Sequence, residues 1–337
     1  MVSFTKEQIE VPKSDEVKTS SLSVLFSRLL KPGGKNVGDF IFENTTRLFA
    51  FILLSLVLLM AYEMFSKSLP SIHKFGWGFI IRTTWDPVHD EFGALPFIFG
   101  TLFSSLIGLL IALPLSVGIA IFLSELSPHW LEQPVSLLVE LLAAIPSIVY
   151  GLFGIFVMTP WLRDKVEPFL GNHFGFLPLF TGPPYGFGML AAGLILTLMI
   201  LPIIASISRD VMKAIPGSMR EAAFALGATK WEVIKIVLSS SKSGILGATL
   251  LGLGRAVGET MAVTMVIGNT PGISTSLFAP GYTMASVLAN EFTEATSDLY
   301  ASSLIEIALL LFVLTIILNA AARFIVWSVT KKYKADY

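Results

Sequence analysis

The stretch GILGATLLGLGRAVGETMAVTMVI, residues 244–267, carries two charged side chains, Arg255 and Glu259, in a run that is otherwise uncharged and mostly apolar. As one helix it would be about 36 Å long, enough to cross a hydrocarbon core about 30 Å thick. Of the 337 residues of the chain, 54% are hydrophobic and only 14% are charged. Soluble domains carry about 25% charged residues. The stretch therefore predicts a helix that lies in lipid.

Five other segments have the length and apolar character of a spanning helix. The six expected spans are 48–65, 95–123, 135–158, 189–207, 244–267 and 304–326. The first follows the long, mostly polar segment 1–47, which does not have the form of a cleavable signal peptide. We expect an all-α integral membrane protein with six transmembrane helices.

Lysine and arginine in the connecting segments predict the orientation, because cytoplasmic loops carry an excess of both. Seventeen fall on the side of both termini and five on the other side. The seventeen are Lys6, Lys13, Lys18, Arg28, Lys31, Lys35, Arg47, Arg209, Lys213, Arg220, Lys230, Lys235, Lys242, Arg323, Lys331, Lys332 and Lys334. We therefore expect a partly flexible cytoplasmic segment 1–47, a transmembrane domain 48–327 with a cytoplasmic loop 209–243, and a cytoplasmic tail 328–337.

Several function classes are disfavoured by the sequence. The net charge of −1 gives no basic field for nucleic acid. Cysteine is absent and the four histidines have no metal-ligand spacing, so neither thiol catalysis nor a metal site is expected. Gly252, Gly254 and Gly258 superficially match a dinucleotide fingerprint, but no strand precedes them. No catalytic residue is assigned, and the chain is not expected to be an enzyme.

The loop IPGSMREAAFALGATKWEVIKIVL, residues 215–238, contains two capping-box patterns, Ser218 with Glu221 and Thr229 with Glu232. Gly227 lies between them and is typical of a helix C-terminus, since glycine adopts the left-handed conformation at little cost. The pattern predicts two short helices joined at an angle. From the residues alone, a surface hairpin without a partner and a helix that docks on a partner are equally plausible.

Arg255 would lie about 16 Å along the fifth span, counted from Gly244, and Glu259 one turn further on the same face. A lone arginine at mid-bilayer costs about 2.5–3.5 kcal/mol on insertion scales, so we do not expect it to face lipid. One interpretation is a structural ion pair that locks the helix bundle. In the other, both residues face a water-accessible path, where Arg255 binds a tetrahedral oxyanion. An ionised Glu259 would accept a hydrogen bond from the O–H group that hydrogen phosphate carries and sulfate lacks.

Other features have simpler interpretations. The Gly254–Gly258 pair predicts a close helix contact. The membrane acids Glu63, Glu125, Glu140 and Glu306 are expected to reach the interface. The segment YTMASVLANEF, residues 282–292, predicts a short helix on the outer face. Trp85-Asp86-Pro87 is expected to be an outer turn with an interfacial anchor, and contact with a binding protein is the alternative.

EAAFALGA, residues 221–228, resembles the EAA loop of ABC importer permeases, through Glu221, Ala222, Ala223 and Gly227. The Leu-Pro that usually follows in that motif is replaced here by Ser239-Ser240. The resemblance implies a type I importer permease (MetI-like) fold in a prokaryotic inner membrane, with this loop docking on a separate ATPase. Mg-ATP is expected in that partner and no cofactor in this chain.

GRAVGETMAVTMVIGN (254–269), TTWDPVHDEFGALPFIFGTL (83–102), ELLAAIPSIVYGLFG (140–154) and MASVLANEF (284–292) resemble the PstC family of phosphate importer permeases. The resemblance implies high-affinity phosphate import, heterodimerisation with a PstA-like permease, a PstB-like ATPase dimer and a PstS-like extracytoplasmic binding protein. It also implies that Arg255 and Glu259 serve phosphate passage. A permease for sulfate or molybdate, or an ion-coupled secondary transporter, remains as the alternative.

Overall fold

A computed structural model describes residues 37–334 of the chain, with side chains over residues 41–328. Most of the predicted cytoplasmic segment 1–47, and the last three residues of the tail, lie outside these residues. The chain divides into two compact units, Met1–Met60 and Ala61–Tyr337, and each is described by itself. In the described residues all regular elements are helices, apart from an isolated antiparallel bridge between Asp86 and Glu91.

Helix α2 (Val37–Phe75) runs from the first unit into the second and contains the first predicted span. In the first unit its side chains are almost all exposed and mostly apolar, among them Phe51 at 68% and Leu53 at 67%. An apolar surface all round a helix is typical of a helix that faces lipid. The helix extends beyond the predicted span 48–65 at both ends, because the residues that flank the apolar run are also helical.

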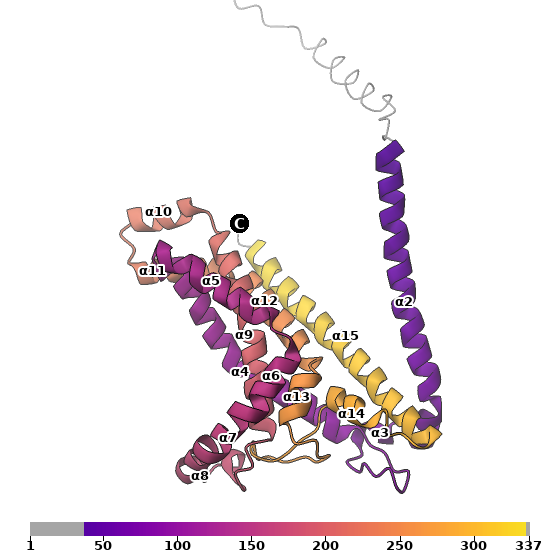
Figure 1. Cartoon of the computed structure of the whole chain (residues 1–337). Helices are drawn as coiled ribbons and strands as arrows, with labels where there is room; N and C mark the ends of the chain where they lie inside the picture. Colours follow the sequence, from indigo (N-terminus) through magenta and orange to yellow (C-terminus); the bar gives the residue numbers. More distant parts are fainter. Residues whose placement is uncertain (1–36, 335–337) are drawn as a thin grey trace, which may run out of the picture. The chain divides into compact units, whose positions relative to one another are not determined.

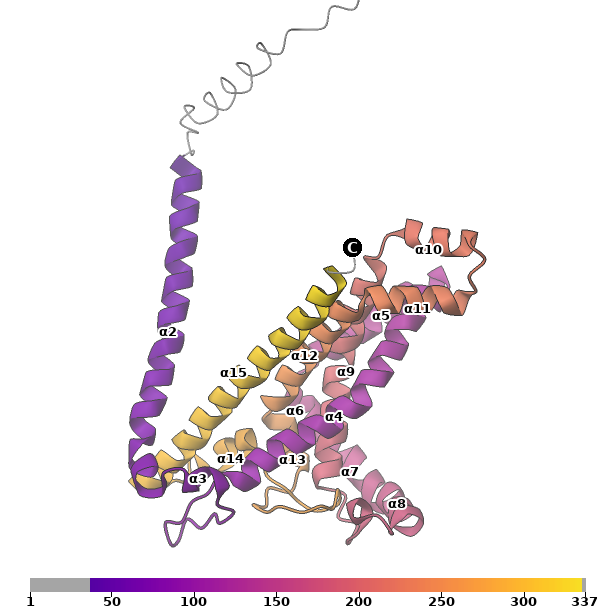
Figure 2. The same cartoon turned by 180° about the vertical axis from the view of Figure 1, so that it is seen from behind.

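The second unit is a bundle of long helices joined by short ones (Figures 1 and 2). The long helices are α4 (Leu95–Ile121), α5 (His129–Ala144), α9 (Met189–Lys213), α12 (Lys242–Val257) and α15 (Asp298–Lys334). The shorter elements are α3 (Gly78–Ile81), η1 (Phe122–Leu126), α6 (Ser147–Phe153), η2 (Gly154–Met158), α7 (Thr159–Trp161), η3 (Leu162–Val166), α8 (Glu167–Phe174), η4 (Pro178–Phe180), α10 (Gly217–Ala225), α11 (Lys230–Ser240), α13 (Met261–Val266) and α14 (Met284–Glu291). Helices α10 and α11 lie at one end of this unit, while α3, α8 and α14 lie toward the other (Figure 1).

Four helices among the described residues are long and apolar enough to cross a membrane: Ile41–Phe75, Leu95–Leu126, Met189–Lys213 and Asp298–Ser328. Two bent pairs raise the number to six if each pair is one span. They are His129–Ala144 with Ser147–Phe174, bent by 94°, and Lys230–Ser240 with Lys242–Val257, bent by 64°. The predicted all-helical membrane fold is therefore confirmed, with four to six candidate spans.

Two of the predicted spans are not continuous helices. The third, 135–158, breaks between α5 and α6, where Ile145 has ψ 129° before Pro146. Proline disfavours the helical conformation of the residue before it, so this break follows from the sequence. The fifth, 244–267, breaks after Val257, and α13 begins only at Met261. Here the residues of the break are Gly258, Glu259 and Thr260.

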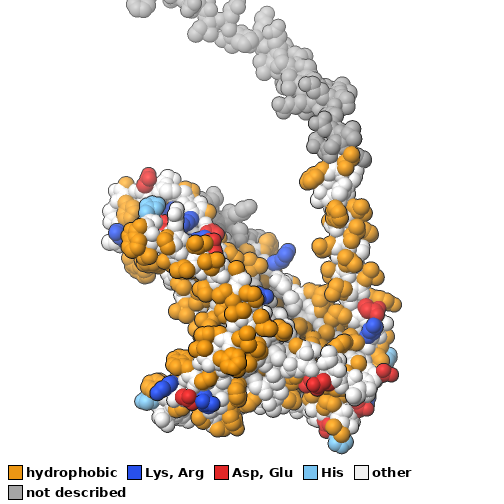
Figure 3. Space-filling model, viewed as in Figure 1, with side chains coloured by type: hydrophobic (Ala, Val, Ile, Leu, Met, Phe, Trp, Pro, Cys, Tyr) orange, Lys and Arg blue, Asp and Glu red, His pale blue; other side chains and the backbone are white. Residues whose placement is uncertain are grey.

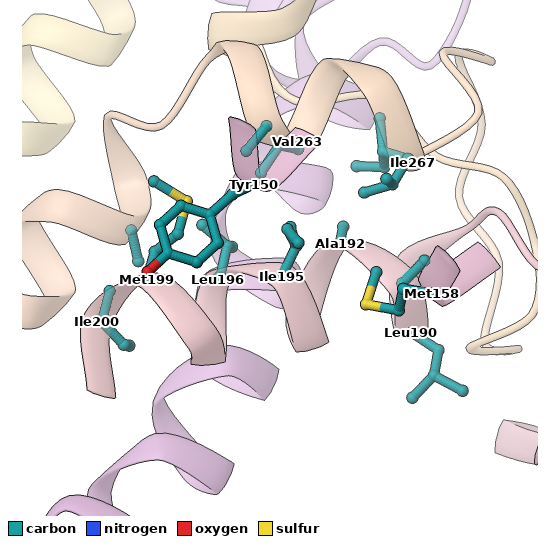
Figure 4. Packing of buried hydrophobic residues seen from close by; sticks show 14 of the residues in the cluster. Tyr150, Met158, Leu190, Ala192, Ile195, Leu196, Met199, Ile200, Val263 and Ile267 are labelled. Carbon is teal, nitrogen blue, oxygen red and sulfur yellow. The ribbon is translucent and has the colours of Figure 1, made fainter. Parts of the chain in front are cut away.

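The core of the second unit is built around α9, whose side chains Ile195, Leu196 and Ile200 are almost completely buried (Figure 4). Helix α4 packs closely on α9 at two glycines. A Cβ on Gly193 would lie 2.4 Å from Cγ2 of Ile107, and a Cβ on Gly108 would lie 2.9 Å from Cβ of Leu196. Small residues let two membrane helices approach in this way, because packing and not water exclusion holds them together.

Helix α14, predicted within 282–292, is confirmed, and the Thr283 side chain caps it through a capping box with Ser286. One face of it is buried, because Met284 and Val287 pack in a second cluster with Phe97 of α4 and Leu304 of α15, while Ala289 is exposed.

Trp85 is half-buried in the same region and donates from Nε1 to Oε2 of Glu291 at 2.8 Å. Asp86 accepts from the backbone N–H of Val88 at 2.9 Å. The Trp85-Asp86-Pro87 segment is thus a turn, as predicted, but its tryptophan is anchored in protein.

Hydrophobic and charged side chains occupy different parts of the surface (Figure 3). Hydrophobic side chains cover the middle of the second unit in this view, and charged side chains gather toward its two ends. This distribution is expected for a protein whose middle lies in hydrocarbon and whose ends lie in water.

Candidate functional site

Arg255 lies on an exposed flank of α12. The buried face of this helix carries Ala248, Gly252 and Ala256, which pack toward the core. Arg255 follows the exposed Leu251 by one helical turn, and its side chain is 48% exposed. The guanidinium is therefore outside the core of this chain. It is a cation on the surface of a membrane helix, about 20 Å along α12 from its start at Lys242.

Glu259 lies in the break between α12 and α13 and turns inward. Its side chain is 3% exposed, and Oε2 lies 3.4 Å from Nη2 of Arg255. Its other oxygen, Oε1, accepts the N–H of Ala262 at 3.3 Å, in the first turn of α13. The carboxylate thus satisfies an amide that a helix start leaves without a partner. The two charges form a pair as predicted, but only Arg255 is accessible, whereas both were expected to face a path.

The glycines around this pair differ from the expected pattern. A Cβ on Gly254 would meet nothing within 4 Å, and one on Gly258 would meet only the carbonyl oxygen of Gly254. Within residues 37–334, Gly254 and Gly258 make no close contact with another helix of this chain, so the expected helix contact stays a prediction for a partner. Gly252 makes the close contact instead, since its Cβ would lie 2.7 Å from Cδ1 of Ile204 on α9.

The predicted pair of short helices in the loop is present as α10 and α11, joined at Gly227. Gly227 has φ +84°, and the N–H groups of Gly227 and Ala228 donate to Phe224 O at 2.9 Å and Ala223 O at 3.0 Å. These two hydrogen bonds are those of a Schellman motif, which ends α10. The capping box of Thr229 and Glu232 is confirmed at the start of α11.

The capping box predicted for Ser218 and Glu221 is wrong. Helix α10 begins at Gly217 with Pro216 at its N-cap, and no side chain caps it. Pro216 has ψ 137°, outside the helical region, so the helix can begin only at the residue that follows it. Ser218 is therefore inside the first turn, where it cannot act as the cap.

The surface of α10 is open. Glu221 and Ala222 are exposed, while Ala223 is buried against the unit. Phe224 and Leu226 expose 49% and 90% of their surface. Two large apolar side chains in such exposed positions on a short helix, next to an acid, are typical of a docking surface more than of a free hairpin.

Ion pairs at this end of the unit were not recognised from the sequence. Arg220 contacts Glu125 at 2.8 Å, Arg209 contacts Glu140 at 3.0 Å, and Lys213 contacts Glu132. Each pair joins elements far apart in the chain, so no local spacing could have predicted it. The acids Glu125 and Glu140, expected only to reach the interface, have specific arginine partners.

The two other membrane acids differ from each other. Glu63 pairs with Lys67 at 3.1 Å on the exposed surface of α2, in keeping with an interfacial position. Glu306 is 6% exposed on α15, and one of its oxygens has no hydrogen-bond partner in the described structure. The interfacial interpretation of Glu306 is therefore wrong, because α14 and α2 pack over the first turns of α15 and bury it.

Comparison with known proteins identifies the family. Residues 112–331 match the family described as "Binding-protein-dependent transport system inner membrane component". The phosphate transport system permease protein PstC of Mesorhizobium japonicum is 48% identical over 85% of this chain and 89% of its own length. PstC of Pasteurella multocida is 46% identical over 87% and 93%. The probable PstC of Methanocaldococcus jannaschii is 38% identical over 80% and 87%.

Solved structures support the same fold. A chain of the MetNI methionine ABC transporter in an inward-facing conformation is 20% identical, covers 68% of this chain and 93% of its own, and gives a TM-score of 0.50. A chain of a bacterial ABC transporter involved in alginate import is 16% identical, covers 85% and 99%, and gives 0.52. From the matched description and these relatives, the chain belongs to the PstC family of phosphate transport system permease proteins, within the binding-protein-dependent inner membrane transport components.

Proposed function

We propose that the chain is the permease subunit of an ATP-driven, high-affinity importer of inorganic phosphate in a prokaryotic inner membrane. The names of its relatives and the exposed cation on α12 support this substrate class. We further propose that both termini and the α10–α11 end face the cytoplasm. The seventeen lysine and arginine residues on that side, against five on the other, support the orientation.

The half-exposed Arg255 carries the proposal for the site. A guanidinium that faced lipid at this depth would cost about 2.5–3.5 kcal/mol on insertion scales. The side chain is 48% exposed on this chain alone, so something other than hydrocarbon must cover it. A second, PstA-like permease subunit on this flank, with a water-accessible passage between the two, satisfies that requirement. Gly254 and Gly258, which have free space beside them, would let such a subunit approach closely.

The chemistry of the pair suits a transported anion. Arg255 offers a planar set of N–H donors to phosphate oxygens. Glu259 is not accessible to the anion, so it acts on Arg255 by holding the guanidinium and reducing its net charge. A site that must release its ligand on each cycle needs this kind of restraint, because a fully uncompensated cation in a low-dielectric passage holds an anion strongly.

The open face of α10 supports docking on a PstB-like ATPase dimer, through Glu221, Ala222 and the turn at Gly227. Ala223 contributes from the other face of α10, where its small side chain keeps the helix close to the unit. A PstS-like protein would deliver phosphate at the opposite end. ATP binding in the partner would shift the pair of permease subunits between outward- and inward-facing states that differ in packing.

The test is ATP-dependent uptake of radiolabelled phosphate by proteoliposomes that contain the complete complex. Arg255→Gln should abolish uptake while the purified complex retains all its subunits. Arg323→Gln is the matched control, because Arg323 is also an exposed arginine of a membrane helix but lies on α15. Normal uptake by Arg255→Gln would refute the role of the site, and loss of assembly would indicate a structural ion pair.

The same vesicles separate the alternatives. Sulfate or molybdate that displaces phosphate at comparable concentration would indicate a different oxyanion. Uptake that is driven by a proton gradient without ATP would indicate a secondary transporter.

A further inference from the structure

Arg220 attaches α10 to the rest of the second unit. It precedes Glu221, but one step along a helix turns the side chain by 100°. Glu221 is therefore exposed, whereas the side chain of Arg220 is only 21% exposed. The two neighbours thus lie on different faces of α10, one open and one turned to the unit.

The guanidinium of Arg220 makes four hydrogen bonds. Nε and Nη2 donate to the two oxygens of Glu125, at 3.2 and 2.8 Å. Nη1 donates to the carbonyl of Ile215 at 2.7 Å, and Nη2 also donates to the carbonyl of Met212 at 2.9 Å. A bidentate arginine–carboxylate contact fixes orientation as well as distance.

The groups that Arg220 holds are the ends of two other helices. Glu125 belongs to η1, the π-helical turn that continues α4, and its side chain is 9% exposed. Met212 lies in the last turn of α9 and Ile215 follows it. The final carbonyls of a helix have no partner within it, and a buried carboxylate needs one. The Met212 carbonyl also accepts the N–H of Ile215 at 3.2 Å, so loss of Arg220 would chiefly leave the Glu125 carboxylate and the Ile215 carbonyl without this donor.

Few direct contacts fix α10 to these helices, although α11, which follows α10, packs Val237 against Ala120 of α4 and Met212 of α9. Among the residues of α10 only Ala223 is buried, and the chain that joins α10 to α9 consists of residues 214–216. The other ion pairs at this end, Lys213 with Glu132 and Arg209 with Glu140, join α5 to α9 and do not involve α10. Helices α4 and α9, in contrast, are the closely packed pair of the core.

We propose that Arg220 is a positioning residue that makes α10, the end of α4 and the end of α9 move as one body, so that motion of the docked ATPase reaches the core. This inference rests on the proposed docking of α10 on an ATPase. Without the Arg220–Glu125 contact, the ATPase would still bind to the open face of α10, but its motion would be absorbed between α10 and the membrane helices.

The coupling test measures phosphate transported per ATP hydrolysed in the reconstituted complex. In Arg220→Ala this ratio should fall by about fivefold or more, the lower end of ordinary coupling between sites, while the ATPase still co-purifies. Glu125→Gln keeps one carbonyl acceptor and should give a smaller fall. Lys213→Ala removes an ion pair at the same end without touching α10, and its ratio should equal that of the unchanged complex.

A second measurement keeps the inference testable if the complex does not transport phosphate. The chain has no cysteine, so Leu126→Cys and Ala225→Cys introduce two unique label sites, at exposed positions of η1 and α10. Double electron–electron resonance between spin labels at these two sites, on the chain without ATPase, should give a narrow distance distribution. Arg220→Ala should broaden that distribution. An unchanged transport ratio in Arg220→Ala, or an unchanged distribution, would overturn the inference. Absence of ATP-dependent phosphate uptake in the unsubstituted complex would refute only the proposed function.

Discussion

Replacing Gly227 by alanine isolates the backbone conformation that ends α10. Its φ of +84° lies in the left-handed region, and an added Cβ would meet nothing within 4 Å. The substitution therefore introduces no clash, and its whole cost is conformational. The left-handed conformation costs an L-residue about 1–2 kcal/mol. A change of that size raises the population of the opened turn by about 5- to 30-fold.

Hydrogen exchange measured by mass spectrometry on the purified chain can detect this change. The amides of Gly227 and Ala228 donate across the turn, so they report its opening directly. Both should exchange about 5- to 30-fold faster in Gly227→Ala, and Gly227→Asn should lie between, because asparagine tolerates the left-handed region better.

The matched control is Gly217→Ala. Gly217 is the first residue of α10, and a Cβ there also meets nothing within 4 Å, but its φ is not in the left-handed region. Alanine at this position should leave exchange unchanged or slow it, because it restricts the unfolded chain. If both alanines accelerated exchange equally, the cost could not come from the sign of φ, and the assignment of the turn would be refuted.

Three further outcomes are expected. The pKa of His89 is raised above its ordinary value of 6.5, chiefly by its hydrogen bond to Asp86. The stabilisation from this contact is therefore complete below pH 6.5 and is lost as the pH rises through the raised pKa. In an NMR titration, Asp86→Asn should return the pKa of His89 toward 6.5, and an unchanged pKa would contradict the contact. Gly193→Ala places a Cβ 2.4 Å from Cγ2 of Ile107 and should lower the free energy of unfolding by about 1–3 kcal/mol, seen as a lower Tm in detergent, whereas Gly247→Ala has free space and should not. Glu259→Gln keeps an acceptor for the N–H of Ala262 but removes the negative charge 3.4 Å from Arg255. The uncompensated guanidinium should hold phosphate more strongly, so both the KM and the maximal rate of phosphate uptake should fall. An unchanged KM would argue against an effect of the Glu259 charge on phosphate binding.

The sequence predicted those parts of the fold that depend on composition over long segments. The spans within α2, α4, α9 and α15 follow from apolar length alone, and the structure has each of them as a long helix. The break at Pro146 could have been predicted as well, since proline restricts the residue before it. The break after Val257 could not, because Gly258 is compatible with a helix and what replaces the missing helical bonds is a side-chain contact from Glu259.

The site was predictable in its residue types and only partly in its geometry. Arg255 was singled out because a cation in an apolar run demands an explanation, and the structure exposes it. The partner of Arg220 could not be predicted, since Glu125 lies on a distant segment and only tertiary packing brings the two together. The contact of Gly252 with Ile204 could not be predicted either, because the sequence does not show which face of α12 packs on α9.

The break after Val257 changes the charge that the site presents. In a continuous helix, residues four apart lie on the same face, so Glu259 would have been exposed beside Arg255 and the accessible surface would be close to neutral. The break lets the carboxylate turn inward, where it accepts the N–H of Ala262 and is 3% exposed. The pair remains together, and the guanidinium alone is accessible on this flank. In the passage that we propose, a hidden carboxylate and an exposed guanidinium would disfavour metal cations and favour oxyanions such as phosphate.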